Sequence, residues 1–369
     1  MTDRIKIMRA GLEGRGLDGI LVTDLKNVRY LAGFTGTSGY VLLTSLKASH
    51  AGAAGFFFTD SRYALQARGE VKGLRITIYK KAIEEIAGTV KGLGLKRVGF
   101  DGRNLSYDTF RRLKKLLPAV RLKSSPDAVE GKRAVKDADE VEYIRGAIAA
   151  AGKGFESVEK RGIGGVTEKE VSIRIEAAVK KAGADALSFE TIVASGFRSA
   201  MPHAVASGKR IKKGELVIVD MGVELGGYRS DETRTYAVGS ATAAQKKIYS
   251  TVKDAQMRAL DAIRPGARAK DVDGAARTCI RKAGYGKYFG HGTGHGVGLD
   301  VHERPHISPQ STDVFEEGMV VTVEPGIYIP GFGGVRIEDM ALVTRDGAEV
   351  LTGEAGRLAG VAAGLRIIE

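Results

Sequence analysis

The sequence predicts an α/β domain over residues 1–130 and a larger α+β domain over residues 131–369 with pseudo-twofold symmetry. The first prediction follows from short β-rich runs that alternate with helical ones, a pattern typical of an α/β domain. The second follows from two segments that each read as two helices and then a β-hairpin. With 369 residues, of which 43% are hydrophobic, the chain can form both domains around sizeable cores.

In the first domain, runs rich in β-branched and aromatic residues predict strands, and two amphipathic runs predict helices. The predicted strands are Gly19–Val22, Gly39–Thr44, Gly55–Thr59, Leu74–Tyr79 and Arg97–Phe100. The predicted helices are Ala82–Leu93 and Tyr107–Leu117. Leu122–Lys136 has a proline, mixed charge and no hydrophobic period, so we expect it to be the linker between the domains.

In the second domain, two capping boxes mark helix starts, Thr167 with Glu170 and Thr242 with Gln245. Each half of this domain reads as two helices and a hairpin. The elements of the first half are helices Ala138–Val158 and Thr167–Lys181 and a hairpin Glu215–Val238 that turns at Gly226-Gly227. Those of the second half are helices Thr242–Ile263 and Lys270–Ala283 and a hairpin Met319–Thr344 that turns at residues 330–334.

The composition excludes several classes of protein. No apolar run reaches the length of a membrane span, residues 1–30 lack a signal-peptide pattern, and the single Cys279 is typical of a reducing cytoplasm. The net charge of +13 is concentrated in residues 1–130, which hold 23 Lys and Arg against 12 Asp and Glu. No basic run is interleaved with aromatic residues, so we expect a solvated basic surface and no nucleic acid partner.

The stretch from Gly290 to Glu303 contains His291, His295 and His302, half of the six histidines in the chain. Its five glycines in nine residues prevent a regular helix and allow the backbone to fold tightly, and neutral imidazole is a common metal ligand. A glycine-rich loop with solvent-facing histidines is the alternative, but it leaves the regular spacing unexplained. We therefore expect these side chains to converge on a site.

The segment His302-Glu303-Arg304-Pro305-His306 fits the zinc-protease pattern H-E-x-x-H. That pattern requires a helix that places both histidines on one face. Pro305 disfavours a helix here, and so do the glycines upstream. This reading is excluded, and His302 is kept for another role.

Acidic residues interrupt the most apolar parts of both predicted hairpins. The midpoint between Asp220 and Asp231 falls between Leu225 and Gly226, beside the turn glycines. Residues equidistant from a hairpin turn lie opposite each other on one face, so this spacing predicts a cross-strand pair of carboxylates.

The second hairpin repeats this arrangement, because the midpoint between Glu324 and Glu338 is Gly331. Buried carboxylates that face each other repel unless a cation lies between them. Ion pairs with arginines could explain one of the two carboxylate pairs but hardly both. The candidate arginines are Arg229, Arg234 and Arg336.

A set of two Asp, two Glu and one His is oxygen-rich. It suits two divalent ions about 3.5–4 Å apart with bridging carboxylates. Mn or Co is favoured and Zn or Fe is possible, because structural zinc sites prefer thiolates and more imidazoles.

The second domain resembles the pita-bread metallopeptidases, which include methionine aminopeptidase, aminopeptidase P and prolidase. The segments that carry this resemblance are VDMG with SDETRT, GHGTGHGVGLDVHE, TVEPGIY and VRIED. The resemblance implies that the metal ligands are Asp220, Asp231, His295, Glu324 and Glu338, with Asp231 and Glu338 bridging. It also implies that Glu324 is a general base and acid. The family's proton-shuttle and substrate positions would be taken by His291, His302, His203 and Arg336.

The first domain resembles the creatinase-type N-terminal domain of the proline-specific members, through YLAGFTGTSGY and FTDSRYALQA. Methionine aminopeptidases lack such a domain, so the resemblance implies hydrolysis of the bond before proline. Chain length favours an Xaa-Pro dipeptidase. An Xaa-Pro aminopeptidase acting on longer peptides is the alternative, and a non-enzymatic binding protein on the same fold is a third reading.

In the mechanism that this resemblance implies, a metal-held hydroxide attacks the carbonyl before proline, and His302 hydrogen-bonds the intermediate. Glu324 or His291 protonates the leaving nitrogen, and Arg336 can pair with a substrate carboxylate in a bidentate way. We expect a homodimer, with Asp60-Ser61-Arg62-Tyr63 as the candidate contact, although a surface Asp–Arg pair explains that segment equally well. Relatives often carry Arg at the position of His306, which leaves the substrate contacts there open.

Overall fold

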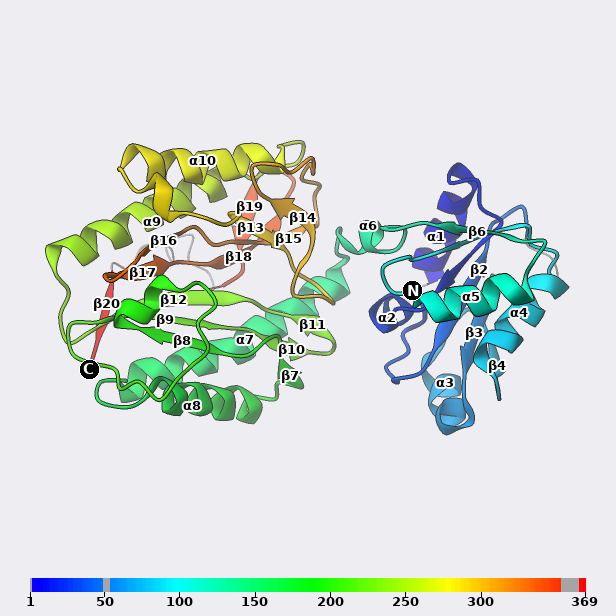
Figure 1. Ribbon diagram of the computed structural model, residues 1–369, viewed down its shortest axis with the longest axis horizontal. Helices are drawn as coiled ribbons and strands as arrows, with labels where there is room; N and C mark the ends of the chain where they lie inside the picture. Colours follow the sequence, from blue (N-terminus) through cyan, green and yellow to red (C-terminus); the bar gives the residue numbers. More distant parts are fainter. Residues whose placement is uncertain (1, 49–53, 353–364) are drawn as a thin grey trace. The chain divides into compact units, whose positions relative to one another are not determined.

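The computed structural model describes residues 2–48, 54–352 and 365–369. The chain divides into two compact units, Met1–Arg133 and Ala134–Glu369. The predicted fold class is confirmed, because the first unit is α/β and the second is α+β with a repeated arrangement of helices and sheet (Figure 1). Among the described residues, no helix is both long and apolar enough to cross a membrane.

The first unit is built on a six-stranded sheet with the strand order β4-β3-β2-β1-β5-β6. Strand β2 is antiparallel to both of its neighbours, and the other neighbouring pairs are parallel. The strands are β1 (Gly19–Val22), β2 (Tyr40–Thr44), β3 (Gly55–Thr59), β4 (Arg75–Ile78), β5 (Arg97–Phe100) and β6 (Arg121–Ser124). The first five confirm the predicted strands to within one residue at each end.

The predicted linker is wrong at its start, because Arg121–Ser124 forms edge strand β6 beside β5. The side chains of β6 are mostly exposed, so no apolar face marks this segment as a strand in the sequence. It is a strand because its backbone pairs with β5. A short helix, α6 (Glu130–Arg133), also lies in this segment.

The helices of the first unit are only partly those predicted from the sequence. Predicted helices α4 (Ala82–Gly92) and α5 (Tyr107–Leu116) are confirmed, and their apolar faces join the sheet in one core that includes Ile86, Leu113 and Phe58. Besides α6, three described helices and one 3-10 turn of this unit were not predicted. They are α1 (Thr2–Gly14), α2 (Leu25–Ala32), α3 (Ala64–Glu70) and η1 (Ser61–Tyr63).

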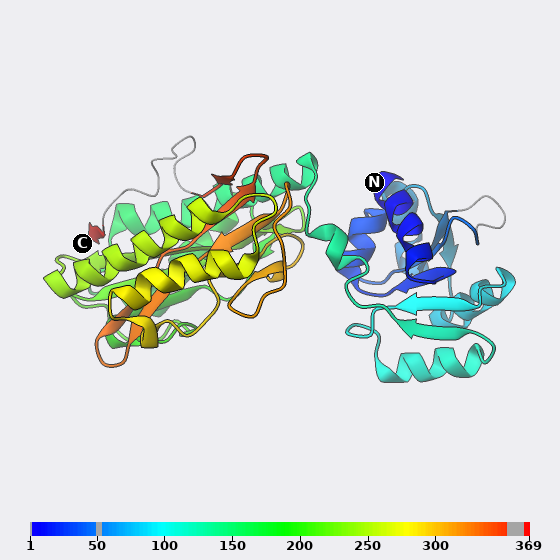
Figure 2. The same ribbon diagram turned by 90° about the horizontal axis from the view of Figure 1, so that it is seen from above.

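The second unit has two helix pairs, each packed on its own sheet. Helices α7 (Ala138–Arg161) and α8 (Glu168–Lys181) cover the sheet of order β20-β12-β9-β8, and α9 (Ala243–Ala262) and α10 (Ala269–Lys282) cover the sheet of order β14-β13-β15-β18-β19. Figure 2 shows α9 and α10 lying side by side. Both predicted capping boxes are confirmed at the starts of α8 and α9.

The described strands of the second unit belong to four sheets. They are β7 (Ala186–Leu187), β8 (Ile192–Ser195), β9 (Leu216–Met221), β10 (Val223–Leu225), β11 (Tyr228–Arg229), β12 (Glu232–Val238), β13 (Gly294–Gly296), β14 (Glu303–Ile307), β15 (Val320–Val323), β16 (Gly326–Ile329), β17 (Gly333–Arg336), β18 (Asp339–Val343), β19 (Ala348–Val350) and β20 (Arg366–Ile368). Because residues 303–307 form a strand, the exclusion of a helical zinc-protease motif is confirmed.

The register of the first hairpin differs from the prediction by one residue at its centre. Leu225 pairs with Tyr228 and Asp220 pairs with Thr233, so Asp220 and Asp231 are diagonal neighbours and not direct partners. The two-residue turn consists of Gly226 and Gly227 themselves, both with positive φ. Asp220 and Asp231 still share one face of the hairpin, as predicted, because Asp231 is two residues from Thr233, the direct partner of Asp220.

The register of the second hairpin is as predicted. Val323 pairs with Asp339, and Gly326 pairs with Arg336, so the hairpin is centred on Gly331. Glu324 and Glu338 therefore occupy facing positions in the gap between these two ladders.

The two halves of the second unit meet where β12 lies beside the end of β17. The hydroxyl of Thr235 donates to the carbonyl of Arg336 at 2.8 Å, and the Glu338 amide donates to the carbonyl of Thr233 at 3.1 Å. This seam brings the acids of both hairpins together.

Candidate active site

All five predicted metal ligands line one cavity of about 730 Å³. Each lies within or beside a strand of the second unit. Asp220 is in β9, Asp231 precedes β12, His295 is in β13, Glu324 follows β15, and Glu338 lies between β17 and β18.

The tightest cluster consists of Asp231, His295 and Glu338, whose potential ligand atoms all lie within 4.8 Å of one another. His295 Nε2 is 3.7 Å from Asp231 Oδ2 and 3.4 Å from Glu324 Oε1. His295 Nδ1 lies 3.1 Å from the carbonyl oxygen of Gly296, which assigns the proton to Nδ1 and turns the Nε2 lone pair toward the acids. Burial, and secondly His302, lowers the pKa of His295 to about 3, so the imidazole is neutral.

The carboxylates destabilise one another when all are ionised. Burial, and then the neighbouring acids, raise the pKa of Asp231 and of Glu338 well above the ordinary values. Burial, together with Asp220, raises the pKa of Glu324 to about 7. Asp231, Glu324 and Glu338 therefore need a cation beside them to be fully ionised at neutral pH.

The residues fit divalent metal ions. Within the described part of the chain, Asp220 Oδ1 is buried and has no hydrogen-bond partner, as a ligand oxygen reserved for a cation would be. The donor set is four carboxylates and one neutral imidazole, which suits hard or intermediate divalent cations. Thr233 donates to Glu338 Oε2 at 2.7 Å and so orients that carboxylate from behind.

Glycines beside His295 allow its strand to lie close to its neighbours. A Cβ at Gly294 would stand 2.0 Å from the carbonyl oxygen of Thr322, and one at Gly296 would stand 2.1 Å from that of Arg304. The alternation of glycine and histidine in this stretch therefore has a packing reason.

Arg336 lies behind Asp220 and is only 3% exposed. Its Nη2 donates to Asp220 Oδ2 at 2.5 Å, and its Nη1 donates to the hydroxyl of Tyr328 at 2.9 Å. The Nε donates to Thr233 Oγ1, and Nη1 also donates to the carbonyl of Pro202. Protein acceptors thus take four of the five guanidinium N–H groups. Arg336 lines the cavity, but this arrangement does not offer the bidentate pairing with a substrate carboxylate that the sequence suggested.

The alternative explanation, ion pairing of the acids with arginines, holds for one acid only. Arg229 pairs with Glu224 at 2.7 Å, and Arg234 pairs with Glu232 and Asp339. Among the described ion pairs of these arginines, only that of Arg336 involves a predicted ligand.

The predicted histidines His203, His291 and His302 line the same cavity, and His306 joins them. The ring of His302 is exposed and its centroid is 4.3 Å from that of His295. His306 pairs with His295 across β13 and β14.

His291 is bound on both sides of its ring. Its Nδ1 is 2.7 Å from the carbonyl oxygen of Gly292, and its Nε2 is 3.0 Å from the hydroxyl of Tyr328. Burial lowers the pKa of His291 to about 4, so the ring is neutral and accepts from Tyr328. In this arrangement His302, unlike His291, has an exposed ring that can reach a substrate.

Sequence reasoning missed two residues of the site, Tyr328 and Thr233. Both lie inside the quoted segments TVEPGIY and SDETRT, and Thr233 is the direct partner of Asp220 in the hairpin. Centring the cross-strand pairs on the predicted turn at Gly226-Gly227 would have identified Thr233. It also missed the side chains of the cavity wall, which include Phe189, Ile192 and Val205.

Comparison with known proteins shows the same two-part organisation. The profile of metallopeptidase family M24 matches residues 142–345, and that of the Creatinase/Prolidase N-terminal domain matches residues 4–135. The chain is 37% identical over 353 residues to a Xaa-Pro dipeptidase of Pyrococcus horikoshii, which covers 95% of this chain and 97% of that protein.

Solved structures agree with these matches. A Xaa-Pro dipeptidase from Bacillus anthracis superposes with a TM-score of 0.92 at 40% identity, covering 99% of both chains. An X-Pro aminopeptidase from Thermotoga maritima MSB8 superposes with a TM-score of 0.85 at 34% identity, covering 96% of this chain and 97% of that chain. With its acids, its neutral histidine and both matching domains, the chain belongs to metallopeptidase family M24.

Proposed function

We propose that this protein is an Xaa-Pro dipeptidase that holds two divalent ions and hydrolyses the peptide bond before a terminal proline. The observation that carries the proposal is the convergence of buried acids and a neutral imidazole on one cavity. The near full-length similarity to proteins named Xaa-Pro dipeptidase supports it. The proposed ligands are Asp220, Asp231, His295, Glu324 and Glu338.

Bound divalent ions would activate a water molecule and polarise the substrate carbonyl. Glu324 removes a proton from the attacking water and delivers it to the departing proline nitrogen. His302 donates a hydrogen bond to the oxygen on which negative charge develops. Arg336 holds Asp220 in place, and His291 accepts from Tyr328, which also contacts Arg336.

Proline sets the specificity because its nitrogen in a peptide carries no hydrogen. A site that binds the ring through apolar contact and requires no N–H donor accepts it. Apolar side chains of Phe189, Ile192 and Val205 line the cavity and can form that contact, and His203 lies beside them at the wall.

Xaa-Pro aminopeptidase activity on longer peptides is the second candidate, because a solved relative carries that name. We therefore propose to measure kcat/KM for Ala-Pro, Ala-Pro-amide, Ala-Pro-Ala and Ala-Ala at fixed Mn. A dipeptidase cuts Ala-Pro best and loses activity on the amide. Preference for the tripeptide would reverse the choice between dipeptidase and aminopeptidase, and equal rates on Ala-Ala and Ala-Pro would overturn proline specificity.

For the metal, four carboxylates and one imidazole favour Mn or Co over Zn or Fe. The single cysteine fits a cytoplasmic location.

We also propose a homodimer in which Asp60-Ser61-Arg62-Tyr63 makes contact. Arg62 is exposed and pairs with Asp60 at 2.9 Å, which gives this segment a defined shape. Light scattering that showed a fully active monomer would remove the dimer proposal.

A further inference from the structure

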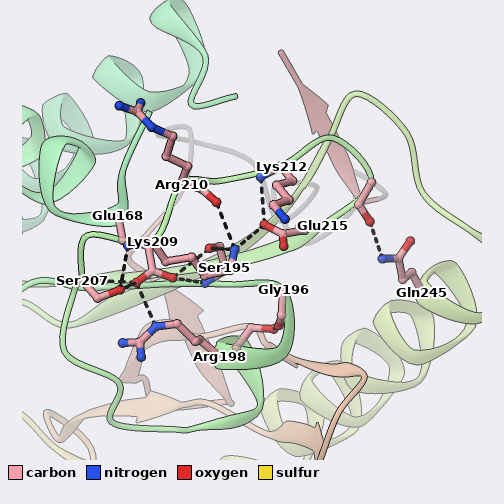
Figure 3. Close-up of polar contacts among 12 residues, drawn as sticks. Glu168, Ser195, Gly196, Arg198, Ser207, Lys209, Arg210, Lys212, Glu215 and Gln245 are labelled. Atoms are coloured by element: carbon pink, nitrogen blue, oxygen red, sulfur yellow. Dashed lines mark hydrogen bonds and ion pairs between the residues drawn. The ribbon is translucent and has the colours of Figure 1, made fainter. Parts of the chain in front are cut away.

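A second buried polar cluster lies outside the metal-binding acids, around Glu168 at the start of α8. Glu168 is 0% exposed, and its carboxylate accepts five hydrogen bonds (Figure 3). Oε1 accepts from the amide and the hydroxyl of Ser195, both at 2.8 Å. Oε2 accepts from Arg198 Nε at 3.0 Å and from the amide and hydroxyl of Ser207 at 3.1 and 2.6 Å. We call these five contacts the Glu168 clamp.

The Glu168 clamp holds both ends of the chain segment from Ser195 to Ser207. Within this segment, Pro202, His203, Ala204 and Val205 line the cavity. Arg198 also donates to the carbonyl of Val205 at 2.6 Å and so braces the segment from inside. One buried carboxylate thus fixes a whole wall of the cavity without contacting the cavity itself.

That wall is also connected to the predicted ligands. The carbonyl oxygen of Pro202 accepts from Arg336, which in turn donates to Asp220. A shift of this wall would therefore change the distance between the wall and the acids that are proposed to hold the metal ions.

The charges around Glu168 are balanced. Lys209 donates to the hydroxyl of Ser195 at 2.8 Å and pairs with Glu215 at 2.7 Å, so two acids are matched by Lys209 and Arg198 (Figure 3). Burial raises the pKa of Glu168, but the hydrogen bonds from Ser207 and Ser195 outweigh burial and leave it below the ordinary value. Glu168 is therefore ionised at neutral pH and strengthens each bond that it accepts.

Capping of helix α8 does not explain these contacts. Thr167 and Glu170 already form a complete capping box at this helix start. The carboxylate of Glu168 points instead at residues that lie 27 to 39 positions later in the chain.

We infer that Glu168 is a positioning residue that sets the place of the Pro202–Val205 wall and thereby the affinity for substrate. The inference rests on the proposed function for its kinetic consequence. Because the wall lines the cavity proposed to hold the substrate and the proposed metal ligands lie on other segments, loss of the clamp should act on KM more than on kcat.

The test compares wild type, Glu168→Gln and the matched control Glu170→Gln, all as metal-loaded full chains, in steady-state hydrolysis of Ala-Pro. Displacement of a binding wall by a fraction of an ångström to 1 Å is expected to raise KM ~10-fold or more in Glu168→Gln, with a much smaller change in kcat. Metal content per chain should be unchanged, and Glu170→Gln should match wild type in KM. A wild-type KM in Glu168→Gln, or a loss confined to kcat or to metal content, overturns the inference.

A second measurement does not depend on activity. Limited trypsin digestion reports how firmly the segment is held, through the rate of cleavage after Arg198. We expect this cleavage to be faster in Glu168→Gln than in wild type and Glu170→Gln, and equal rates would overturn the inference. If wild type failed to cut Ala-Pro, the proposed function would be lost, while the digestion would still decide whether the clamp holds the wall.

Should Glu168→Gln fail to fold, Ser207→Ala replaces it. This variant removes one hydroxyl from the Glu168 clamp and leaves the charges intact. It should raise KM and the cleavage rate in the same direction by a smaller factor, and no change in either would count against the clamp.

Discussion

Arg336 donates to Oδ2 of Asp220 at 2.5 Å, while Oδ1 of the same buried carboxylate has no hydrogen-bond partner in the described chain. Thr233 and Tyr328 hold Arg336 in turn. Asp220 is therefore oriented through one oxygen and keeps the other free. This is the arrangement expected of a metal ligand that the protein positions before the metal binds.

Metal removal should destabilise the second unit. The acids of the site repel one another without a cation, so ions that bind only the folded state stabilise it by about 2.7 kcal/mol at 100 times their Kd. We expect chelation to lower Tm and abolish peptidase activity, and Mn or Co to restore both. Calorimetry with and without chelator checks this. Full activity after exhaustive metal removal would contradict the metal-dependent mechanism.

Substitutions should separate ligands from groups that act on substrate. Asp231→Asn and Glu338→Gln remove charge from the tightest cluster, so both should lose metal as well as rate. His302→Ala should keep its metal and lose ~10²-fold or more in kcat, because it removes a donor to the developing oxyanion. Elemental analysis after dialysis, together with kcat, provides the measurement. If His302→Ala emptied the site while His295→Ala left it full, the two roles would be exchanged.

A methyl group beside His295 should displace its strand. Gly294→Ala places a Cβ 2.0 Å from the carbonyl oxygen of Thr322, which cannot move without disturbing β15. We expect the free energy of unfolding to fall by about 1–3 kcal/mol and metal affinity to fall with it. Gly290→Ala is the control from the same stretch, because no described atom lies within 4 Å of its added Cβ. Equal stability of the two variants in urea would contradict this explanation of the glycines.

The Glu168 clamp predicts a defined dependence of stability on pH. The folded-state pKa of Glu168 lies below the ordinary value of 4.5, so the unfolded state binds more protons in the window between them. Stability from this carboxylate is complete above 4.5 and is lost as pH falls through the folded-state pKa. The stability advantage of metal-free wild type over metal-free Glu168→Gln should shrink across that window. Urea unfolding at several pH values measures this difference in the free energy of unfolding. A difference that grew as the pH fell would contradict the prediction.

Much of the fold could be predicted because its signals are local. Capping boxes act within one helical turn, so Thr167 and Thr242 marked the starts of α8 and α9 correctly. Hairpin register depends on the turn, and the acids of the second hairpin were placed correctly around Gly331. In the first hairpin the turn at Gly226-Gly227 was predicted correctly, but the direct pairing of Asp220 with Asp231 was wrong, because a two-residue turn at these glycines pairs Asp220 with Thr233.

Other elements carried no sufficient local signal. Edge strand β6 has exposed side chains and exists through its pairing with β5, so its sequence resembles that of a linker. Helix α1 has a weakly segregated apolar face and was missed for a related reason.

The sequence by itself determined which acids and imidazole are available as candidate ligands, the two hairpins that carry the acids, and the glycines that let the strand of His295 approach its neighbours. Tertiary structure decided which partner each polar group takes. Arg336 meets Asp220 across 116 residues, and Glu168 meets Ser207 across 39. A buried charge is stable only when it is paired, and which partner reaches it depends on how the sheets and helices pack. Because of that packing, Arg336 donates to Asp220, where the sequence suggested a contact with a substrate carboxylate. The same packing places Glu168 where it binds both ends of the segment that forms the cavity wall.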